Sequence, residues 1–373
     1  MALDSVETAL AAIAAGELVV VVDDTDRENE GDLIMAASKA TPEKIAFMIR
    51  HTSGIICVPM PAARAAELNL EPMVANNIDP FRTAFTVTVD YKVGMTTGIA
   101  ATERAATIRA LAGGNAHASD FIRPGHIFPL VARDGGVLAR SGHTEAGVDL
   151  ARMAGLEPAG VLAEVVNDDG TVKRLPELLE FAAEHGLKII SIEDLIAYRL
   201  AKETFLSRVA VVPTIISGMR AEAYAYETPF DPVQQVALVI GDVHGKANVP
   251  CRIIREQPLR DLLGRAGAEA DPVARAVAEI KARGGTGIVL LLRSAAALDH
   301  ETDGRRTPVL DGQGDESHGS AVKRMSGWRE VGVGSQILRD LGVGSIALMT
   351  SSGRQYVGLG GYGIEIGETI PLS

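Results

Sequence analysis

LVVVVDDTDRENEGD, residues 18–32, joins a run of branched hydrophobic residues directly to an acidic segment. Four consecutive valines favour a buried β-strand, and this strand must end at Asp23, because carboxylates are not buried without partners. The Ala-rich stretch from Ser5 to Ala15 precedes it and predicts a helix that ends at Gly16. The sequence therefore predicts a helix and then a buried strand that delivers an acidic loop.

Helical and strand-like segments continue to alternate after this loop. Thr41 and Pro42 are typical of the cap and first turn of a helix, which we extend to about His51. Ser191 and Asp194 form a capping box that begins a later helix. We also expect helices at 101–111 and 175–185, and strands at 55–58, 85–89, 161–166 and 188–190. Such alternation, with few aromatic residues, indicates the α/β class.

The chain has 373 residues, more than one hydrophobic core usually serves, so we expect two domains. Strands dominate after Phe205, until helical patterns at 272–283 and 335–341. We therefore predict one domain at 1–203 and a second at 204–373. The Gly-, Asp- and Ser-rich segment between His300 and Trp328 lacks hydrophobic periodicity and is typical of a mobile loop.

Composition excludes several classes of protein. The net charge of −12 argues against nucleic acid as a partner, because such binding depends on Lys and Arg. No segment has the length of a membrane span, and Asp4 and Glu7 stand where a signal peptide would be basic. The only cysteines, Cys57 and Cys251, cannot form a disulfide framework and suggest a reducing compartment. We expect a cytoplasmic protein.

The acidic segment from Asp23 to Asp32 contains six carboxylates and one arginine. It could be a solvated turn. Carboxylates this close repel one another, however, and a hard divalent cation that prefers oxygen ligands would relieve the repulsion. A metal site is therefore an open alternative at this point.

A second polar segment is RSGHT, Arg140 to Thr144, which precedes a predicted helix. It offers a guanidinium, hydroxyls, an imidazole and the backbone N–H groups of a helix start, which together suit a phosphate ester. The alternative is structural: Thr144 would cap the helix and His143 would be an ordinary surface histidine.

Three further residues can carry chemistry. His126 lies within RPGHIFPL, where a lone histidine is more often structural. Cys57 falls on a predicted strand, where it would usually be a small buried hydrophobe. Glu164 interrupts the apolar run 161–166 and must face solvent or have a partner, so it suits a catalytic acid or base.

Taken in order, several segments closely resemble 3,4-dihydroxy-2-butanone 4-phosphate synthase over about residues 3–200. They are DDTDRENEGD, HTSGIICVP, FTVTVDYKVGMTTGIAATERAATIR, RPGHIFPL, RSGHTEAGVDL and VLAEVVNDDGT. The resemblance implies a three-layer domain with a mixed sheet, a homodimer with sites near the subunit interface, and conversion of D-ribulose 5-phosphate into 3,4-dihydroxy-2-butanone 4-phosphate and formate. This is a step of riboflavin synthesis, and it depends on Mg²⁺, with Mn²⁺ as a possible substitute.

The same resemblance implies roles for individual residues. Glu28 and His143 would bind the metal. His126 and Glu164 would be the acid–base pair, with Cys57 a third candidate for proton transfer. The substrate would be held by Arg27, Glu28, Asp32, Arg140, Ser141, Gly142, His143, Thr144 and Glu164.

The second half, about residues 205–373, resembles GTP cyclohydrolase II in its framework, through RVAVVPTIISGMRAEAYAY, VALVIGDV, QILRDLGVGSIALMT and GLGGYGIEIGETIPL. That family has three zinc-binding cysteines in one short segment, whereas this chain has NVPCRIIREQPLRDLLG with Cys251 alone. Its nucleotide-binding stretch is replaced by LLLRSAAALDH. A catalytic zinc needs about three protein ligands, so we expect no zinc and an inactive cyclohydrolase-like domain.

Two alternatives remain beside a synthase with one activity. A bifunctional protein would retain GTP cyclohydrolase II activity, and the missing cysteines count against it. A non-catalytic sensor of sugar phosphates or nucleotides would be expected to carry a damaged acidic loop, His126 or Glu164, and all of these are present.

Overall fold

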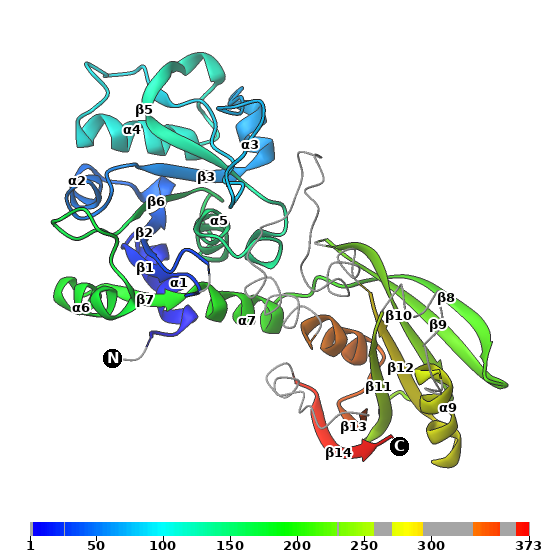
Figure 1. Ribbon diagram of the computed structural model, residues 1–373. Coiled ribbons are helices and arrows are strands. Elements are labelled where there is room, and N and C mark those ends of the chain that lie inside the picture. The colour runs from blue at the N-terminus through cyan, green and yellow to red at the C-terminus, as the bar shows by residue number, and fades with distance from the viewer. Residues whose placement is uncertain are drawn as a thin grey trace. The chain divides into compact units, whose positions relative to one another are not determined.

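The computed structural model describes residues 3–25, 27–229, 231–256, 271–293, 331–350 and 363–372. They form two units that divide between Tyr198 and Arg199 (Figure 1). Each unit is an α/β domain built on a seven-stranded mixed sheet, which confirms the predicted fold class. The predicted mobile loop between His300 and Trp328 lies outside the described residues.

The sheet of the first unit mixes parallel and antiparallel neighbours. The pairs β3–β5 and β1–β7 are parallel, and the other neighbours are antiparallel. The strands lie in the order β4 (Val89–Tyr91), β5 (Phe121–Ala132), β3 (Cys57–Pro61), β6 (Gly160–Glu164), β2 (Gly31–Ala36), β1 (Val19–Val22) and β7 (Lys188–Ser191).

Local sequence signals set where the helices begin and end. Ser5 accepts a hydrogen bond from the backbone N–H of Thr8, and the left-handed Gly16 ends the helix, as predicted. Thr41 caps the next helix in the same way, and Gly186 ends a later one. The helices are α1 (Val6–Ala15), α2 (Pro42–His51), α3 (Ala62–Glu67), α4 (Ala101–Ala112), α5 (His143–Met153), α6 (Leu175–His185) and α7 (Ile192–Lys202), with 3₁₀ turns η1 (Ala37–Lys39), η2 (Ala118–Asp120) and η3 (Gly136–Leu138).

The sheet is covered on both faces, which gives the expected three layers. Val20 and Val22 of β1 join a core with side chains of α2, α4 and α6, whereas Val19 and Val21 are buried against the opposite face. Helix α5 contacts β2, β3, β5 and β6. Figure 1 shows α2 and α5 on opposite sides of the central strands. The valine run is therefore buried on both faces, and Asp23 follows at the end of the strand.

One strand of this unit was predicted only in part, and two were not predicted. The strand expected at 85–89 forms only in part, because Phe85 makes an isolated bridge to Leu130 and β4 begins at Val89. The long strand β5 was not predicted, because Pro124 and Pro129 interrupt the strand pattern. Strand β2 was not predicted either, because it follows the acidic loop without a break.

In the second unit, one half of the sheet is parallel and the other antiparallel. The order is β14 (Glu365–Pro371), β13 (Ser345–Thr350), β11 (Val249–Arg255), β12 (Gly287–Leu292), β10 (Asp231–Ile240), β9 (Met219–Thr228) and β8 (Ser207–Ile216). The first four strands are parallel to one another. Helix α9 (Pro272–Ala282) packs on one face, and the helix at 331–340 contributes to the core on the other.

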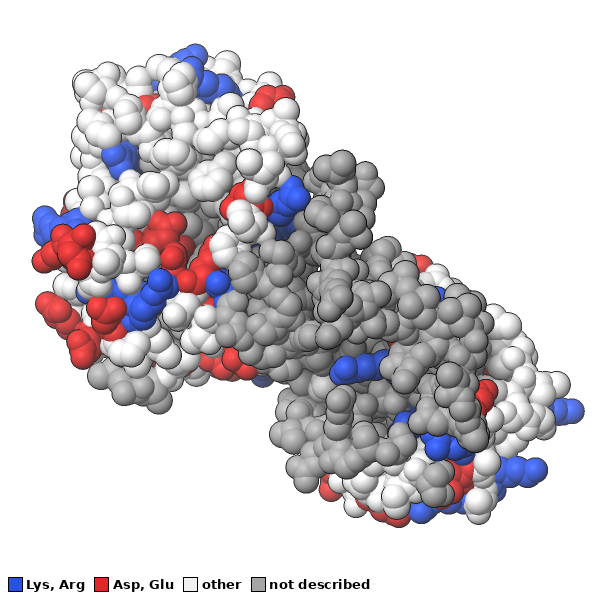
Figure 2. Space-filling view, in the orientation of Figure 1, with Lys and Arg blue, Asp and Glu red and all other residues white. Residues whose placement is uncertain are grey.

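The distribution of charge and the hydropathy of the helices agree with what the composition excluded, a nucleic-acid-binding surface and a membrane span. On the face drawn in Figure 2, the Lys and Arg side chains of the described residues lie among Asp and Glu and do not gather into one basic surface. None of the described helices combines the length and the apolar character that crossing a membrane requires.

Candidate active site

A cavity of about 220 Å³ in the first unit brings most of the predicted site residues together. Ser141, Gly142 and His126 are not among the residues that line it. Its lining consists of Arg27, Glu28, Glu30, Asp32, Cys57, Asp79, Phe81, Thr83, Phe85, Leu130, Arg140, His143, Thr144, Leu162 and Glu164.

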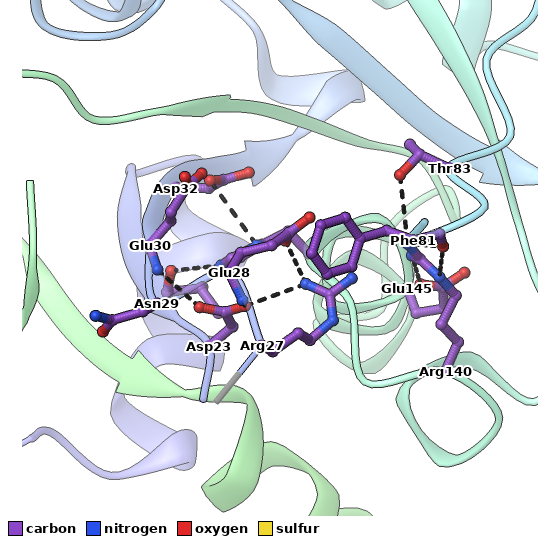
Figure 3. Close-up of polar contacts among 12 residues, drawn as sticks. Asp23, Arg27, Glu28, Asn29, Glu30, Asp32, Phe81, Thr83, Arg140 and Glu145 are labelled. Atoms are coloured by element: carbon purple, nitrogen blue, oxygen red, sulfur yellow. Dashed lines mark hydrogen bonds and ion pairs between the residues drawn. The ribbon is translucent and has the colours of Figure 1, made fainter. Parts of the chain in front are cut away.

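The acidic loop folds around Asp23 and is not a solvated turn. One carboxylate oxygen of Asp23 accepts the backbone N–H of Glu28 at 2.9 Å, and the other accepts that of Glu30 at 2.8 Å. The Arg27 guanidinium lies 3.1 Å from Asp23 and also bonds to Glu28 (Figure 3). Asn29 has a left-handed backbone, with φ of 55°. These contacts aim the Glu28 carboxylate into the cavity.

His143, the first residue of α5, is held by both ring nitrogens. Nε2 lies 3.1 Å from the carbonyl oxygen of Val21, so this nitrogen donates, and Nδ1 is left to face the two carboxylates. Nδ1 lies 3.7 Å from Glu28 and 3.9 Å from Asp32. A ring fixed by a carbonyl on its far nitrogen is the usual arrangement of a metal-binding histidine.

The charges of Glu28, Asp32 and His143 influence one another's pKa values. Burial alone would raise the pKa of Glu28, but the His143 hydrogen bond and the charge of Arg27 outweigh it and lower the pKa to about 2. Burial raises the pKa of Asp32 to about 8. Burial lowers the pKa of His143, but the charge of Asp32 and the hydrogen bond to Glu28 outweigh burial and raise this pKa to about 9.

The donor set fits a hard divalent cation. One donor atom each of Asp23, Glu28 and His143 lies within 4.8 Å of the other two. Asp32 adds a buried carboxylate oxygen without a hydrogen-bond partner among the described residues. Mg²⁺ typically takes one or two carboxylates and keeps several waters. Asp23 was not predicted as a donor, although its place at the end of the valine run could have indicated it.

Glu164 and Cys57 reach the cavity from neighbouring strands. Glu164 lies opposite Asp32 in the β2–β6 pair and accepts a hydrogen bond from the Ser53 hydroxyl at 2.5 Å. Cys57 pairs with Leu162 on β6. Burial raises the pKa of the Cys57 thiol well above its usual value, and the nearby Glu164 and Asp32 add to this. The thiol therefore stays protonated, which disfavours it as a base.

Arg140 is buried and is held from two sides. Its Nη1 donates to Glu145 at 2.8 Å, while Nε and Nη2 donate to the carbonyl oxygen of Phe81 at 3.3 and 2.9 Å (Figure 3). Gly142 is the N-cap of α5, so Thr144 lies inside the helix and is not its cap. Phe81 and Glu145 were missed by sequence reasoning. Phe81 lies outside the polar segments, and Glu145 directly follows RSGHT, where its pairing with Arg140 could have been considered.

His126 lies apart from this cavity. It is on β5, and its Nδ1 lies 2.7 Å from Oδ2 of Asp90, while Oδ1 of Asp90 accepts its backbone N–H at 2.9 Å. The side chain is 41% exposed. Within one chain the structure therefore does not bring His126 and Glu164 together.

Comparison with known families divides the chain in two. Residues 7–198 match the family model of 3,4-dihydroxy-2-butanone 4-phosphate synthase, and residues 207–371 match that of GTP cyclohydrolase II. "Riboflavin biosynthesis protein RibBA" of Mycobacterium marinum is 46% identical over 99% of this chain and 89% of the relative.

Two solved structures are similar. RibBX, a two-domain 3,4-dihydroxy-2-butanone 4-phosphate synthase from A. baumannii, is 37% identical with a TM-score of 0.76, covering 97% of this chain and 99% of that one. A 3,4-dihydroxy-2-butanone 4-phosphate synthase in complex with two magnesium ions is 47% identical with a TM-score of 0.51, covering 52% of this chain and 96% of that one.

Proposed function

Since the chain belongs to the 3,4-dihydroxy-2-butanone 4-phosphate synthase family and has this activity in riboflavin biosynthesis, we propose that its substrate is D-ribulose 5-phosphate and that it releases formate. The observation that carries the proposal is the convergence of Arg27, Glu28, Asp32, His143 and Glu164 on one cavity. Cationic groups for a phosphate and acidic groups for proton transfer are both needed for this substrate.

We propose Glu28 and His143 as the ligands of Mg²⁺, which Mn²⁺ could replace. The geometry of Nδ1 and the low pKa of Glu28 support this choice, because a metal binds the deprotonated forms. When bound, the ion supplies charge stabilisation for an enediolate. Asp23 uses both oxygens in holding the loop, so we regard it as a support for Glu28 and not as a direct ligand.

Glu164 is our candidate for the group that moves a proton to and from the substrate carbons. It lies at the wall of the cavity, and Ser53 orients its carboxylate. Arg27, Arg140 and Thr144 line the cavity and would hold the phosphate near the start of α5. Ser141 and Gly142 do not line it, and the Gly142 N–H already donates to the carbonyl oxygen of Arg140 at 2.9 Å. Cys57 is better placed to exclude water than to transfer protons, because its thiol stays neutral.

We further propose a homodimer in which His126 of one protomer completes the cavity of the other. His126 is half-exposed and fixed by Asp90. Two large apolar side chains, Ile122 and Ile99, are exposed close to His126 in the fold. Ile122 lies opposite Asp90 in the β4–β5 pair, and Ile99 follows Gly98, which lies next to Asp90 and the His126 ring. An apolar surface around an oriented histidine is typical of a subunit interface with a function.

For the second unit, the question is whether it retains GTP cyclohydrolase II activity. The comparisons favour the bifunctional alternative over a single activity, because the cyclohydrolase II model and the RibBA relatives both span this unit. The residues argue differently: Cys251 is the only cysteine here, it is fully buried on β11, and burial raises its pKa to about 12. We propose that this unit does not open the GTP ring, in line with RibBX, a two-domain synthase.

We propose that the protein acts in the cytoplasm, where its two free, buried cysteines stay reduced. The decisive experiment is formate release from D-ribulose 5-phosphate by the full-length protein, with Mg²⁺ and then with excess chelator. Metal-dependent formate supports the proposal. Absence of formate in both conditions would favour the non-catalytic sensor.

A further inference from the structure

Phe81 contacts both arginines that we assign to the phosphate. The Arg27 guanidinium carbon lies 5.2 Å from the centre of the Phe81 ring. The Phe81 carbonyl oxygen accepts hydrogen bonds from Arg140 at 2.9 and 3.3 Å. Figure 3 shows Phe81 between the two guanidinium groups. One residue from a loop thus links the acidic loop to the segment before α5.

The loop that carries Phe81 is closed by its own hydrogen bonds. Asn77 accepts the backbone N–H of Asp79 at 2.9 Å and donates to the carbonyl of Thr83 at 2.9 Å. Asp79 accepts the N–H of Thr83 at 2.8 Å. Arg82, the residue after Phe81, has a left-handed backbone with φ of 54°, a conformation that is unfavourable for a residue other than glycine. The turn geometry therefore fixes where Phe81 points.

The loop that carries Phe81 borders two cavities. Its other side faces a second hollow of about 760 Å³, and Asp79, Thr83 and Phe85 line both cavities. The loop is therefore a partition between two cavities. Phe81 lies at the wall of the smaller one, in contact with Arg27 and Arg140.

Each arginine is paired with at least one carboxylate, which competes with a phosphate ligand for its N–H groups. Arg27 pairs with Asp23 and Glu28, and Arg140 pairs with Glu145. An aromatic ring on the face of a guanidinium leaves the in-plane N–H groups available for ligand oxygens. Stacking on Phe81 therefore holds Arg27 at the cavity wall without using its donors.

We propose that Phe81 is a positioning residue for the sugar phosphate, which acts by setting Arg27 with its ring and Arg140 with its carbonyl. This inference rests on the proposed substrate and on the two arginines as its ligands. A group that preorganises ligands lowers the cost of binding and leaves the chemical step unchanged. The expected readout is therefore KM and not kcat.

The test compares F81A, F81L and F81Y by steady-state formate release from D-ribulose 5-phosphate. We expect KM to rise about 3- to 30-fold in F81A and F81L, as loss of a desolvated cation–π contact implies, with kcat within about twofold. F81Y keeps the ring and should restore a KM close to that of the unchanged protein. F47A, which removes a partly buried aromatic ring of α2 outside the cavity, is the matched control and should leave KM unchanged.

The outcomes separate this inference from the proposed function. Formate from the unchanged protein together with an unaltered KM in F81A would overturn the role of Phe81 alone. An F81L variant as good as F81Y would show that the ring's charge interaction is not used, and would also overturn it. If F81A does not fold, F81L, which keeps most of the volume, carries the test. Absence of formate from the unchanged protein would instead count against the proposed function.

Discussion

Asp32 and Glu164 lie directly opposite each other on the antiparallel strands β2 and β6. Two carboxylates in this relation repel. Burial raises the pKa of Asp32 to about 8, and the nearby charge of Glu164 adds to the rise. The raised pKa shifts Asp32 toward its protonated form, which lessens the repulsion with Glu164 and, to the same extent, the charge that acts on His143.

Replacing Glu164 by Gln should abolish turnover without unfolding the protein. The substitution keeps the shape and one acceptor for Ser53, so the melting temperature should stay close to that of the unchanged protein. Loss of a general acid or base reduces kcat by about 10²- to 10⁴-fold. Formate release and thermal melting are the measurements. A kcat within about threefold of the original would remove Glu164 from the proton-transfer step.

His126→Ala should also be inactive, and mixing it with Glu164→Gln should restore activity. If His126 serves the partner's cavity, a mixed dimer has one intact composite site and one site that lacks both groups. The isolated mixed dimer should then have about half of the original activity, because one of its two sites is intact. Co-expression with two affinity tags, followed by isolation of the mixed species, provides the measurement. No recovery in the mixed dimer would place His126 in its own chain's site or outside catalysis.

Mg²⁺ binding should become tighter as the pH rises and should release a proton. The pKa of His143 is raised to about 9, so at neutral pH the metal must displace a proton from Nδ1. Affinity should therefore rise with pH up to about pH 9, the raised pKa of His143, and level off above it. Calorimetry in two buffers of different ionisation enthalpy measures the proton release. H143A should bind weakly with no such pH dependence.

The metal-free protein should show the reverse trend in stability. A histidine whose pKa is raised on folding stabilises the fold below its unfolded pKa, and this contribution is lost as the pH rises through the raised value. The His143 contribution to the melting temperature in chelator should therefore decline between about pH 6.5 and 9. Comparison of the unchanged protein with H143A isolates it. A difference between the two that does not vary with pH would contradict the assignment.

Glu145→Ala should destabilise the first unit strongly. The side chains of Glu145 and Arg140 are 1% and 5% exposed, and removal of one partner leaves a buried charge, which costs about 3–5 kcal/mol. Glu67→Ala is the control, because Glu67 is 65% exposed in its pair with Arg64 and should cost under about 1 kcal/mol. Denaturant unfolding measures both. Equal losses in the two variants would show that Arg140 finds other partners.

GTP incubated with the protein and Zn²⁺ should not be opened, and the purified protein should contain no stoichiometric zinc. A zinc site needs about three protein ligands, and Cys251 is buried on a strand without a second cysteine in this unit. Absorbance of the ring-opened product and metal analysis are the measurements. Ring opening with bound zinc would establish the bifunctional alternative.

The parts of the fold that depend on neighbours in sequence could be predicted. The valine run, Ser5, Thr41 and the terminating glycines act locally, so β1, α1, α2 and α6 followed from them. Strand β5 could not be predicted, because its prolines are tolerated only where the pairing of the sheet permits them.

The site shows the same division. Residue types pointed to the acidic loop, the RSGHT segment and Glu164, and the family resemblance singled out Glu28 and His143. The structure brings Glu28, His143 and Glu164 to one cavity. The contacts of Phe81 and Glu145 depend on residues about 5 to 60 positions away along the chain, and no local pattern encodes them. The separation of His126 from Glu164 is likewise a property of the folded chain.

Strand β6 has a consequence for how the protein is made. It lies between β3 and β2, so the two halves of the sheet are joined only when residues 160–164 are available. A ribosome that has synthesised the acidic loop has not yet supplied the strand beside it. The nascent chain must wait for more than a hundred further residues, which favours late, cooperative folding and makes this interval the one in which a chaperone would be needed.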